Sequence, residues 1–304
     1  MLIVCVIPAY RAASTIGDVV IGASKVCDEV IVIDDRCPES SGMFAKKAHD
    51  KTIVISRKVN GGVGAATKDG IRKALDMGAE IIVKIDADGQ MAPELIPLLV
   101  APLKADVAGF SKGTRFDNPE DLVGMPKVRI LGNAALSLIN KFSTGYWTVN
   151  DPTNGFLAMR GSVAKEISWE KIDDGYFFES DLLFRLRLIG VRISQMRMKS
   201  AYKGEHSGLR PFSQILPFSL KHLRNQAKRF SYLYLIREWN LGTVYILASF
   251  ITFVIGVTAG ISTIFQSQSG PIGTGTALLS SLGLILSVQF STAFFTFDVT
   301  SEPK

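Results

Sequence analysis

The sequence predicts an α/β protein with a mainly parallel sheet, followed by a membrane-associated C-terminal part. Short apolar runs alternate with helical patterns over the first two thirds of the 304 residues. Such alternation is typical of right-handed crossovers in a parallel sheet. Two later stretches, 241–263 and 272–297, carry no charged residue. Each is long enough to cross a hydrocarbon core of about 30 Å at about 1.5 Å per residue.

The expected strands are short, β-branched runs bounded by turn residues, and they cover 2–7, 29–33, 52–55, 80–85 and 106–111. The expected helices cover 14–26, 42–49 and 64–77, with a further helix beginning at Pro93, because proline suits a first helical turn. Three strands are followed by residues that can bind ligands: Pro8-Ala9-Tyr10, Asp34-Asp35 and Asp86-Ala87-Asp88. Because the carboxyl ends of parallel strands meet at one edge of a sheet, we expect a nucleotide crevice there.

The most informative stretch is the apolar run at 81–85, which ends in Asp86-Ala87-Asp88 and Gln90. Alternate residues of a strand point to the same side, so the two carboxylates are expected to lie together. They repel each other unless a cation lies between them. Hard oxygen ligands suit Mg²⁺ or Mn²⁺, and Mg²⁺ usually shares its shell with phosphates. A polar turn that follows a strand is the alternative interpretation of so short a pattern.

Several other functions do not fit the sequence. The glycine-rich segment 61–64 lacks the Lys-Ser/Thr of a P-loop and does not follow the first strand. The three histidines are scattered, which does not favour the nucleophile set of a hydrolase. Cys5, Cys27 and Cys37 lack metal-ligand spacing, which favours a reduced, cytosolic compartment. We assign the net charge of +6 to basic residues before the first apolar stretch and not to a nucleic-acid surface.

The distribution of basic residues predicts the membrane orientation. Basic residues occur throughout 203–237, whereas the loop 266–271 has none. The N-terminal part and the tail 298–304 are therefore expected on the cytoplasmic side of the inner membrane. The amphipathic segment 211–240 is expected on the membrane surface with Lys and Arg at anionic lipid headgroups. The alternatives are a helix packed on the catalytic domain and, for the apolar stretches, a helix pair buried in a soluble bundle.

Eight short motifs follow one another along the chain. They are Val6-Ile-Pro8-Ala-Tyr10, Val30-Ile-Val-Ile-Asp34-Asp35, Asn60-Gly-Gly-Val-Gly64-Ala65, Asp86-Ala-Asp88-Gly-Gln90, Gly113-Thr-Arg115, Asp151-Pro-Thr-Asn154-Gly155-Phe156, Phe178-Glu179-Ser-Asp181 and Gly204-Glu-His-Ser207-Gly-Leu-Arg210. The ordered set resembles inverting family 2 glycosyltransferases with the GT-A (Rossmann-like) fold. With the basic helix and two spans, the chain resembles the polyprenyl-phosphate glycosyltransferases, which include dolichol-phosphate mannose synthases. Where that group usually has Ser-Lys, this chain has Ser207-Gly208, with Arg210 two positions later.

The resemblance implies roles for individual residues. A UDP- or GDP-linked sugar would contact Pro8, Ala9, Tyr10, Asp35, Asn60, Gly64, Asp86, Ala87 and Asp88. Mg²⁺ or Mn²⁺ would be bound by Asp86, Asp88 and Gln90, with Asp86 acting directly or through ribose and water. The acceptor phosphate would contact Arg115, Ser207 and Arg210. The catalytic candidates are Asp86, Asp88, Arg115, Asp151 and Asp181. We expect Asp34 to be structural and Lys68 to be solvated.

The resemblance also implies a membrane-bound transferase that moves a hexose from a nucleotide sugar to polyprenyl phosphate at the cytoplasmic face. A lipid phosphate is already anionic, so positioning and charge screening would suffice. A sugar hydroxyl would need a base, and Asp151, Glu179 and Asp181 are available. The alternatives are a transferase that extends a lipid-linked or polysaccharide sugar, and a membrane-tethered nucleotide-sugar binding protein.

The expected domain boundaries are 1–210 for the catalytic domain, 211–240 for the juxtamembrane helices, 241–297 for the two spans and 298–304 for the tail. Glycines in the spans, such as Gly256 and Gly260, permit close helix packing and hence a homo-oligomer.

Overall fold

The computed structural model describes residues 1–118, 127–198, 211–267 and 273–304. The chain divides into two compact units, one of residues 1–226 with 303–304 and one of residues 227–302. Helix α8 (Pro211–Phe230) contains the boundary between them, and the domain limits at residues 210, 240 and 297 stay predictions. Ser207 and Arg210, which we expected to bind the acceptor, lie outside the described residues.

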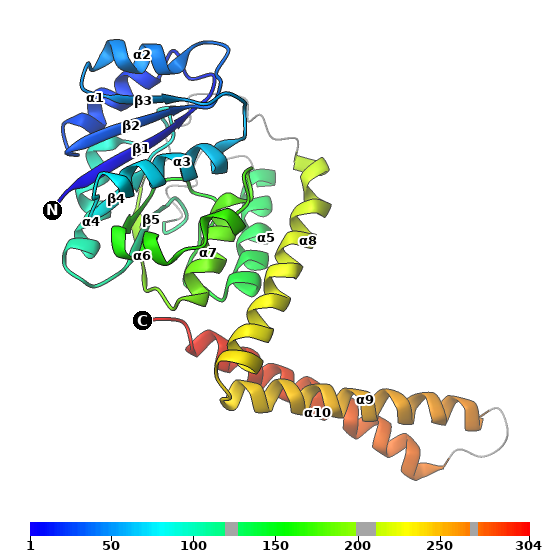
Figure 1. Cartoon of the computed structure of the whole chain (residues 1–304). Helices are drawn as coiled ribbons and strands as arrows, with labels where there is room; N and C mark the ends of the chain where they lie inside the picture. Colours follow the sequence, from blue (N-terminus) through cyan, green and yellow to red (C-terminus); the bar gives the residue numbers. More distant parts are fainter. Residues whose placement is uncertain (119–126, 199–210, 268–272) are drawn as a thin grey trace. The chain divides into compact units, whose positions relative to one another are not determined.

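The first unit is built on a seven-stranded sheet in the order β3-β2-β1-β4-β6-β5-β7, and Figure 1 labels its strands β1 to β5. Its strands are β1 (Ile3–Ala9), β2 (Glu29–Asp34), β3 (Ile53–Ser56), β4 (Ile81–Lys84), β5 (Phe110–Thr114), β6 (Leu157–Arg160) and β7 (Ile193–Arg197). Among the described strands, only β6 runs antiparallel to its neighbours, β4 and β5. The mainly parallel α/β fold is thus confirmed, with one reversed strand inside the sheet.

Helices cover both faces of the sheet. They are α1 (Ile16–Ser24), α2 (Ser41–Ala48), α3 (Val63–Asp76), the 3₁₀ turn η1 (Pro93–Leu95), α4 (Ile96–Lys104), α5 (Lys127–Thr144), α6 (Gly161–Glu166), the 3₁₀ turn η3 (Trp169–Lys171) and α7 (Phe178–Leu188). On β1, Cys5 and Ile7 pack with α1 and α4, whereas Val4 and Val6 pack with α3 and α7. Because both faces of β1 are buried, its sequence is continuously apolar.

The strand predicted at 106–111 lies later in the chain, at Phe110–Thr114. Asp106 adopts a left-handed backbone conformation with φ of 60°, which ends the connection after α4 and cannot belong to a strand. The strand instead includes Lys112, Gly113 and Thr114, which are buried. Their polarity hid the strand from a search for apolar runs.

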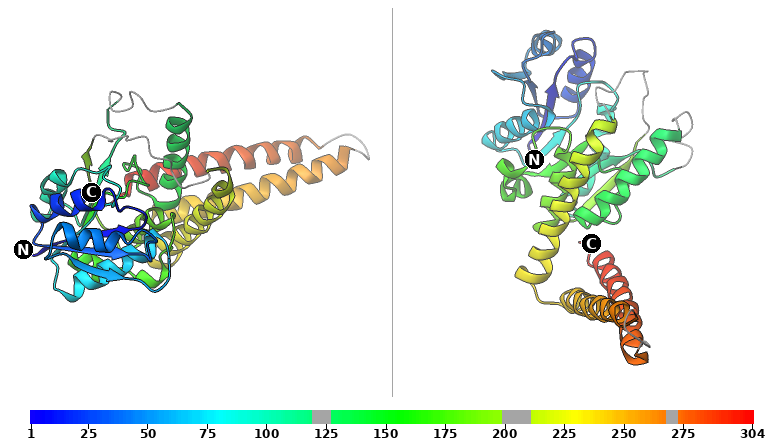
Figure 2. Two further views of the ribbon diagram at one scale, coloured as in Figure 1. Left: turned by 90° about the horizontal axis from the view of Figure 1, so that it is seen from above. Right: turned by 90° about the vertical axis from the view of Figure 1, so that its right-hand side faces the viewer.

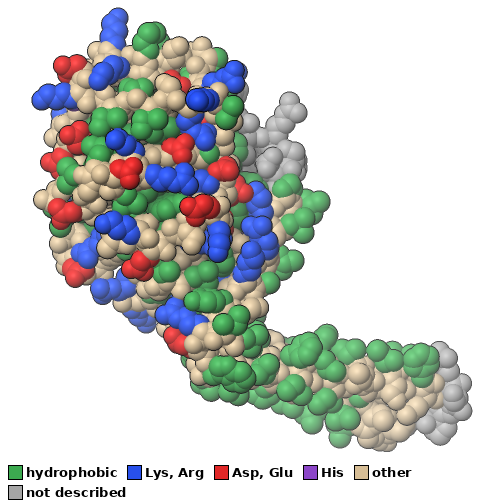
Figure 3. Space-filling view, in the orientation of Figure 1, with side chains coloured by type: hydrophobic (Ala, Val, Ile, Leu, Met, Phe, Trp, Pro, Cys, Tyr) green, Lys and Arg blue, Asp and Glu red, His purple; other side chains and the backbone are tan. Residues whose placement is uncertain are grey.

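The second unit contains a π-helical turn (Ser231–Arg237), α9 (Leu241–Ser267) and α10 (Thr274–Thr300). By length and composition, α9 and α10 are long and apolar enough to cross a membrane. Few of their residues are buried within the protein, unlike the helices of a soluble bundle, and hydrophobic side chains cover them (Figure 3). They lie side by side (Figure 2), and Ser249 Oγ is 2.7 Å from Ser291 Oγ.

Glycines allow the close contact between α9 and α10. A Cβ atom on Gly256 would lie 2.7 Å from the backbone nitrogen of Leu284, and one on Gly283 would lie 2.7 Å from Gly256 Cα. A Cβ on Gly260 would lie 2.8 Å from Ser280 Oγ. Gly256 and Gly260 therefore serve packing inside this helix pair, and a homo-oligomer stays a prediction.

Two expectations about charged residues in this unit are wrong. We expected Arg229 at the lipid headgroups and Asp298 in a tail, yet α10 continues to Thr300 and both side chains are fully buried. The Arg229 guanidinium donates to both Asp298 oxygens, at 2.5 and 2.9 Å, and the Tyr234 hydroxyl donates to the same carboxylate at 2.5 Å. A buried charge needs such partners. An ion pair between residues 69 positions apart cannot be recognised from the sequence.

Candidate active site

The two aspartates that follow β2 have different environments. Asp34 accepts the backbone N–H groups of Cys37 at 2.7 Å and Gly42 at 2.8 Å. A Cβ on Gly42 would contact the Asp34 carboxylate at 2.9 Å, so only glycine fits this approach. Asp34 therefore holds the start of α2, which is the structural role we expected.

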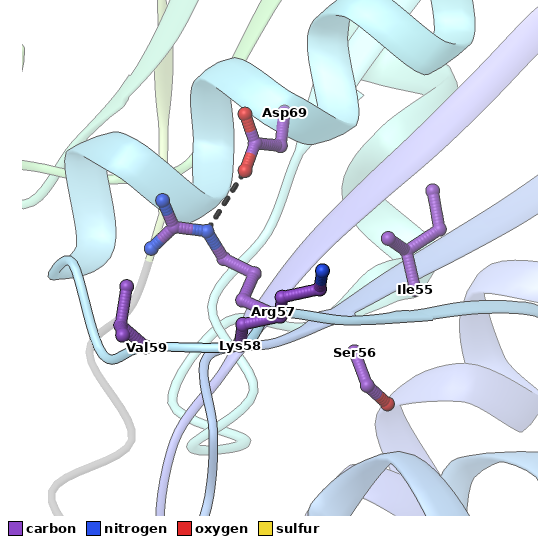
Figure 4. A pocket seen from close by; sticks show the side chains of 6 residues that line it. All are labelled: Ile55, Ser56, Arg57, Lys58, Val59 and Asp69. Atoms are coloured by element: carbon purple, nitrogen blue, oxygen red, sulfur yellow. Dashed lines mark hydrogen bonds and ion pairs between the residues drawn. The ribbon is translucent and has the colours of Figure 1, made fainter.

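Asp35 connects three loops at the edge of the sheet. Its carboxylate accepts Arg57 Nη1 at 2.6 Å and the backbone N–H groups of Gly61 at 2.9 Å and Gly62 at 2.8 Å. Arg57 is held in turn by Asp69 of α3, 2.8 Å from its Nε (Figure 4). The expected donor residue is thus fixed against the glycine loop by an arginine that the sequence analysis did not single out.

A pocket of about 290 Å³ adjoins this arginine and is lined by Ile55, Ser56, Arg57, Lys58, Val59 and Asp69 (Figure 4). At the end of β1, Tyr10 is 46% exposed, and the Arg11 guanidinium lies 5.5 Å from its ring centroid. An exposed aromatic ring at this edge has the accessibility that stacking on a base requires.

Lys68 corrects one expectation, because it is buried and not solvated. Its Nζ donates to the Ile172 carbonyl at 2.9 Å and lies 2.5 Å from Asp174 Oδ1. In the same turn, the Asp174 carbonyl accepts a hydrogen bond from the Ala65 N–H at 3.1 Å. Lys68 therefore anchors α3 to the turn before α7, through partners more than 100 positions away.

The carboxylate pair lies in a turn and not in a strand. β4 ends at Lys84, so the same-side argument for Asp86 and Asp88 does not apply to their backbone. Asp88 Oδ1 accepts the Gln90 N–H at 2.9 Å, and the Thr15 hydroxyl donates to the Ala87 carbonyl at 2.6 Å. The turn is therefore held on α1, and both carboxylates are half-buried.

Lys84 binds the first of these carboxylates and was missed at the sequence level. Its Nζ lies 2.7 Å from Asp86 Oδ1 and 3.1 Å from Glu179 Oε1, and the side chain is 1% exposed. Burial acts to lower the pKa of Lys84, but Asp86 and Glu179 raise the pKa above its usual range. A charged residue within an apolar run was the only available signal.

Arg115 and Asp151 form a bidentate ion pair. Arg115 Nε and Nη2 donate to the two oxygens of Asp151 at 2.6 and 2.8 Å, and Asp151 is 1% exposed. Beneath them, Lys112 Nζ donates to the carbonyls of Asp151 and Pro152 at 2.5 and 2.8 Å. Burial lowers the pKa of Lys112 to about 8. The paired geometry fixes the guanidinium in one orientation, and the catalytic roles of Arg115 and Asp151 stay predictions.

Asp181 lies deeper than a base that meets a substrate would be expected to lie. It is fully buried and accepts the Asp173 N–H at 3.0 Å and the Asn225 side-chain amide at 2.9 Å. Lys221 of α8 pairs with Asp173 at 2.5 Å, and His222 is buried beside them. The alternative that α8 packs on the catalytic domain is therefore supported for these residues, whereas Leu216, Leu220 and Leu223 are exposed.

This sheet, with polar and charged residues at the ends of β1, β2 and β4, defines a GT-A-like fold. The chain belongs to glycosyl transferase family 2, whose family model matches residues 4–168. It is 30% identical over 235 residues to the UDP-N-acetylglucosamine–dolichyl-phosphate N-acetylglucosaminyltransferase of Methanococcus voltae, covering 72% of this chain and 93% of that protein. It is 29% identical over 203 residues to the undecaprenyl-phosphate mannosyltransferase of Micrococcus luteus, covering 64% and 82%.

A solved structure shows the same fold. Glucosyl-3-phosphoglycerate synthase from Mycobacterium tuberculosis, crystallised with Mn²⁺, uridine diphosphate and glucosyl-3-phosphoglycerate, superposes with a TM-score of 0.54 at 20% identity. The match covers 75% of this chain and 79% of that one. At this identity the likeness concerns the fold alone. Family membership identifies the protein as a glycosyltransferase.

Proposed function

We propose that this glycosyltransferase moves a hexose from a nucleotide-diphosphate sugar to a polyprenyl phosphate, with inversion at the anomeric carbon. The observation that carries the proposal is the joint presence of two features in one chain. Asp35 and the Asp86-Ala87-Asp88 turn follow β2 and β4, the two strands that flank β1, and two apolar helices long enough to cross a membrane follow the catalytic unit. The relatives named for dolichyl and undecaprenyl phosphate support the choice of acceptor.

The donor would lie along the sheet edge. Asp35, Tyr10 and the glycine loop, with Asn60 and Gly64, would contact base and ribose, and the Asp86-Ala87-Asp88 turn would contact the diphosphate and sugar. The oxygen atoms of the carboxylates and of Gln90 suit Mg²⁺ or Mn²⁺ as ligands. No three His, Cys, Asp or Glu side chains within the described ranges gather in metal-binding geometry, so the diphosphate would supply further oxygens. When bound, the ion would offset the charge that develops on the leaving diphosphate.

The reaction needs positioning more than proton transfer. A phosphate oxygen of the lipid attacks the anomeric carbon, the bond from that carbon to the diphosphate oxygen breaks, and the nucleoside diphosphate leaves with the electron pair. Because the attacking oxygen is anionic, no side chain must remove a proton. Arg115, held in one orientation by Asp151, would contact the acceptor phosphate.

The membrane arrangement follows from charge and hydrophobicity. We place α9 and α10 across the inner membrane and the catalytic unit on the cytoplasmic side. The sequence before α9 is rich in Lys and Arg, whereas residues 266–271 carry none. Exposed Leu216, Leu220 and Leu223 of α8 would contact the membrane surface, where anionic lipids attract the basic residues nearby.

The test uses the full chain purified in detergent with Mg²⁺ or Mn²⁺. UDP- and GDP-linked sugars are offered with and without polyprenyl phosphate, and release of nucleoside diphosphate is measured. The proposal expects lipid-dependent release that Asp88→Asn abolishes and Lys46→Met, a distant surface change on α2, leaves intact. Release that requires a glycosylated acceptor would contradict the acceptor assignment. Donor binding without turnover under all conditions would indicate a binding protein instead.

A further inference from the structure

Lys84 occupies a buried position in the sheet where its charge needs partners. It is the last residue of β4, an interior strand between β1 and β6. An ammonium group buried in such a place costs several kcal/mol unless partners compensate for it. Asp86 at 2.7 Å and Glu179 at 3.1 Å supply that compensation. Glu179 belongs to α7, so one ammonium group joins the carboxylate turn to a helix 95 positions away.

The backbone of a third motif also approaches this ion cluster. A Cβ atom on Gly155 would overlap with both Lys84 Nζ and Asp86 Oδ2. Asn154 fixes the segment, because its side-chain carbonyl accepts the Phe156 N–H at 2.9 Å. Three separate segments of the chain therefore meet at Lys84. Their contacts leave Asp86 little freedom to rotate.

We propose that Lys84 is a positioning residue that holds Asp86 toward the donor sugar and away from the metal, so that Asp88 is the carboxylate that binds the metal. The inference rests on the proposed function and chooses between the direct and the indirect roles considered for Asp86. One Asp86 oxygen contacts an ammonium group that Glu179 holds from the other side. A second cation on the same carboxylate would be opposed by the charge of Lys84.

Direct Mn²⁺ binding by the full-length protein, measured by electron paramagnetic resonance with nucleoside diphosphate present, tests this division of roles. Asp88→Asn should weaken Mn²⁺ binding by about 30-fold or more, whereas Asp86→Asn should change it by less than about threefold, because only the former removes a ligand. Both residues are half-buried, so these variants are expected to fold. Equal weakening by the two changes would overturn the proposal.

Lys84→Met supplies the second arm of the same measurement. Loss of the ammonium group should release Asp86 to become a further ligand and tighten Mn²⁺ binding by about tenfold, since affinity rises with the number of charged ligands. The gain should vanish in Lys84→Met with Asp86→Asn, because the two residues are coupled. Lys46→Met is the matched control, since Lys46 is exposed and bonds the carbonyls of Asp50 and Thr52. A gain that persists in the double variant would contradict the assigned coupling.

Measurements of kcat distinguish a positioning role of Lys84 from simple neutralisation of the Glu179 charge. Lys84→Met should lower kcat by about 100-fold, the scale of a small misplacement at a reacting centre. Adding Glu179→Gln restores the local charge balance and should recover thermal stability but not kcat. Recovery of kcat would show that Lys84 only neutralises Glu179. A wild-type protein without lipid-dependent turnover would refute the acceptor assignment, while the Mn²⁺ pattern would still test Lys84.

Discussion

Replacing Asp298 by asparagine should strongly destabilise the unit that contains α9 and α10. Arg229 and Asp298 are both fully buried and share two hydrogen bonds. Removing one partner of a buried ion pair leaves an uncompensated charge and typically costs 3–5 kcal/mol. Tyr234, which donates to the same carboxylate at 2.5 Å, keeps a bond to an asparagine oxygen. We therefore expect a loss of about 3 kcal/mol, the lower end of that range.

The assay is thermal unfolding of the full chain in detergent, followed by tryptophan fluorescence. At about 4 °C per kcal/mol, Asp298→Asn should lower the Tm by about 12 °C. Glu238→Gln is the matched control, because the Arg237–Glu238 pair in the same unit is exposed and 3.4 Å apart. Exposed pairs contribute about 0–1 kcal/mol. Arg229→Met combined with Asp298→Leu should regain most of the loss, since apolar replacements of both partners are often neutral or stabilising.

The reasoning would be refuted by either of two results. If Asp298→Asn behaves like Glu238→Gln, the pair is not buried in the folded protein. If the apolar double variant is as unstable as the single variant, the loss does not come from an unpaired charge.

Three further changes follow from the structure. Arg57→Met should free the Asp35 carboxylate, because a hydrogen bond to a charged group is lost. The KM for the donor should rise about tenfold, with a smaller effect on kcat. Steady-state kinetics measure both constants, and an unchanged KM would contradict the prediction. Burial lowers the pKa of His222 to about 4, so between about pH 6.5 and 4 the unfolded chain is protonated at this residue while the folded protein is not. The free energy of unfolding should therefore fall by up to about 3 kcal/mol as the pH drops from about 6.5 towards 4. In denaturant unfolding, His222→Gln should flatten this pH dependence. Gly256→Leu should separate α9 from α10 and lower the Tm, whereas Gly275→Leu should not, because among the described residues no atom beyond its chain neighbours and its own helix backbone lies within 4 Å of a Cβ at Gly275.

The fold could be predicted where its signals are local. β1 to β4 appear in the sequence as β-branched runs with turn residues after them, and the structure places them within one or two residues of expectation. The reversed strand β6 has four residues, Leu157–Arg160, which is too short to show a period. The strand that corresponds to β5 was predicted too early in the chain, because the buried residues of β5 include the polar Lys112. In both cases tertiary partners, and not local preference, decide the conformation.

The candidate site divides in the same way. The Asp35 and Asp86-Ala87-Asp88 motifs are contiguous and could be recognised without coordinates. The complete ion pairs could not, because Arg57 is 22 positions from Asp35, and Lys84, which is close to Asp86 in sequence, also pairs with Glu179 95 positions away. Lys68 was expected in solvent for this reason, although its partner turn buries it. A lysine or arginine in a sequence carries no indication of which carboxylate it will meet.

These cations resolve an electrostatic difficulty in the proposed function. A site with Asp35, Asp86 and Asp151 at its edge would repel both a diphosphate donor and a lipid phosphate if the carboxylates stood alone. Each instead has a cation within 2.7 Å, supplied by Arg57, Lys84 and Arg115 respectively. Because every pair is largely buried, salt in solution screens it weakly. The acidic motifs can therefore orient an anionic donor through hydrogen bonds without presenting three net negative charges to it.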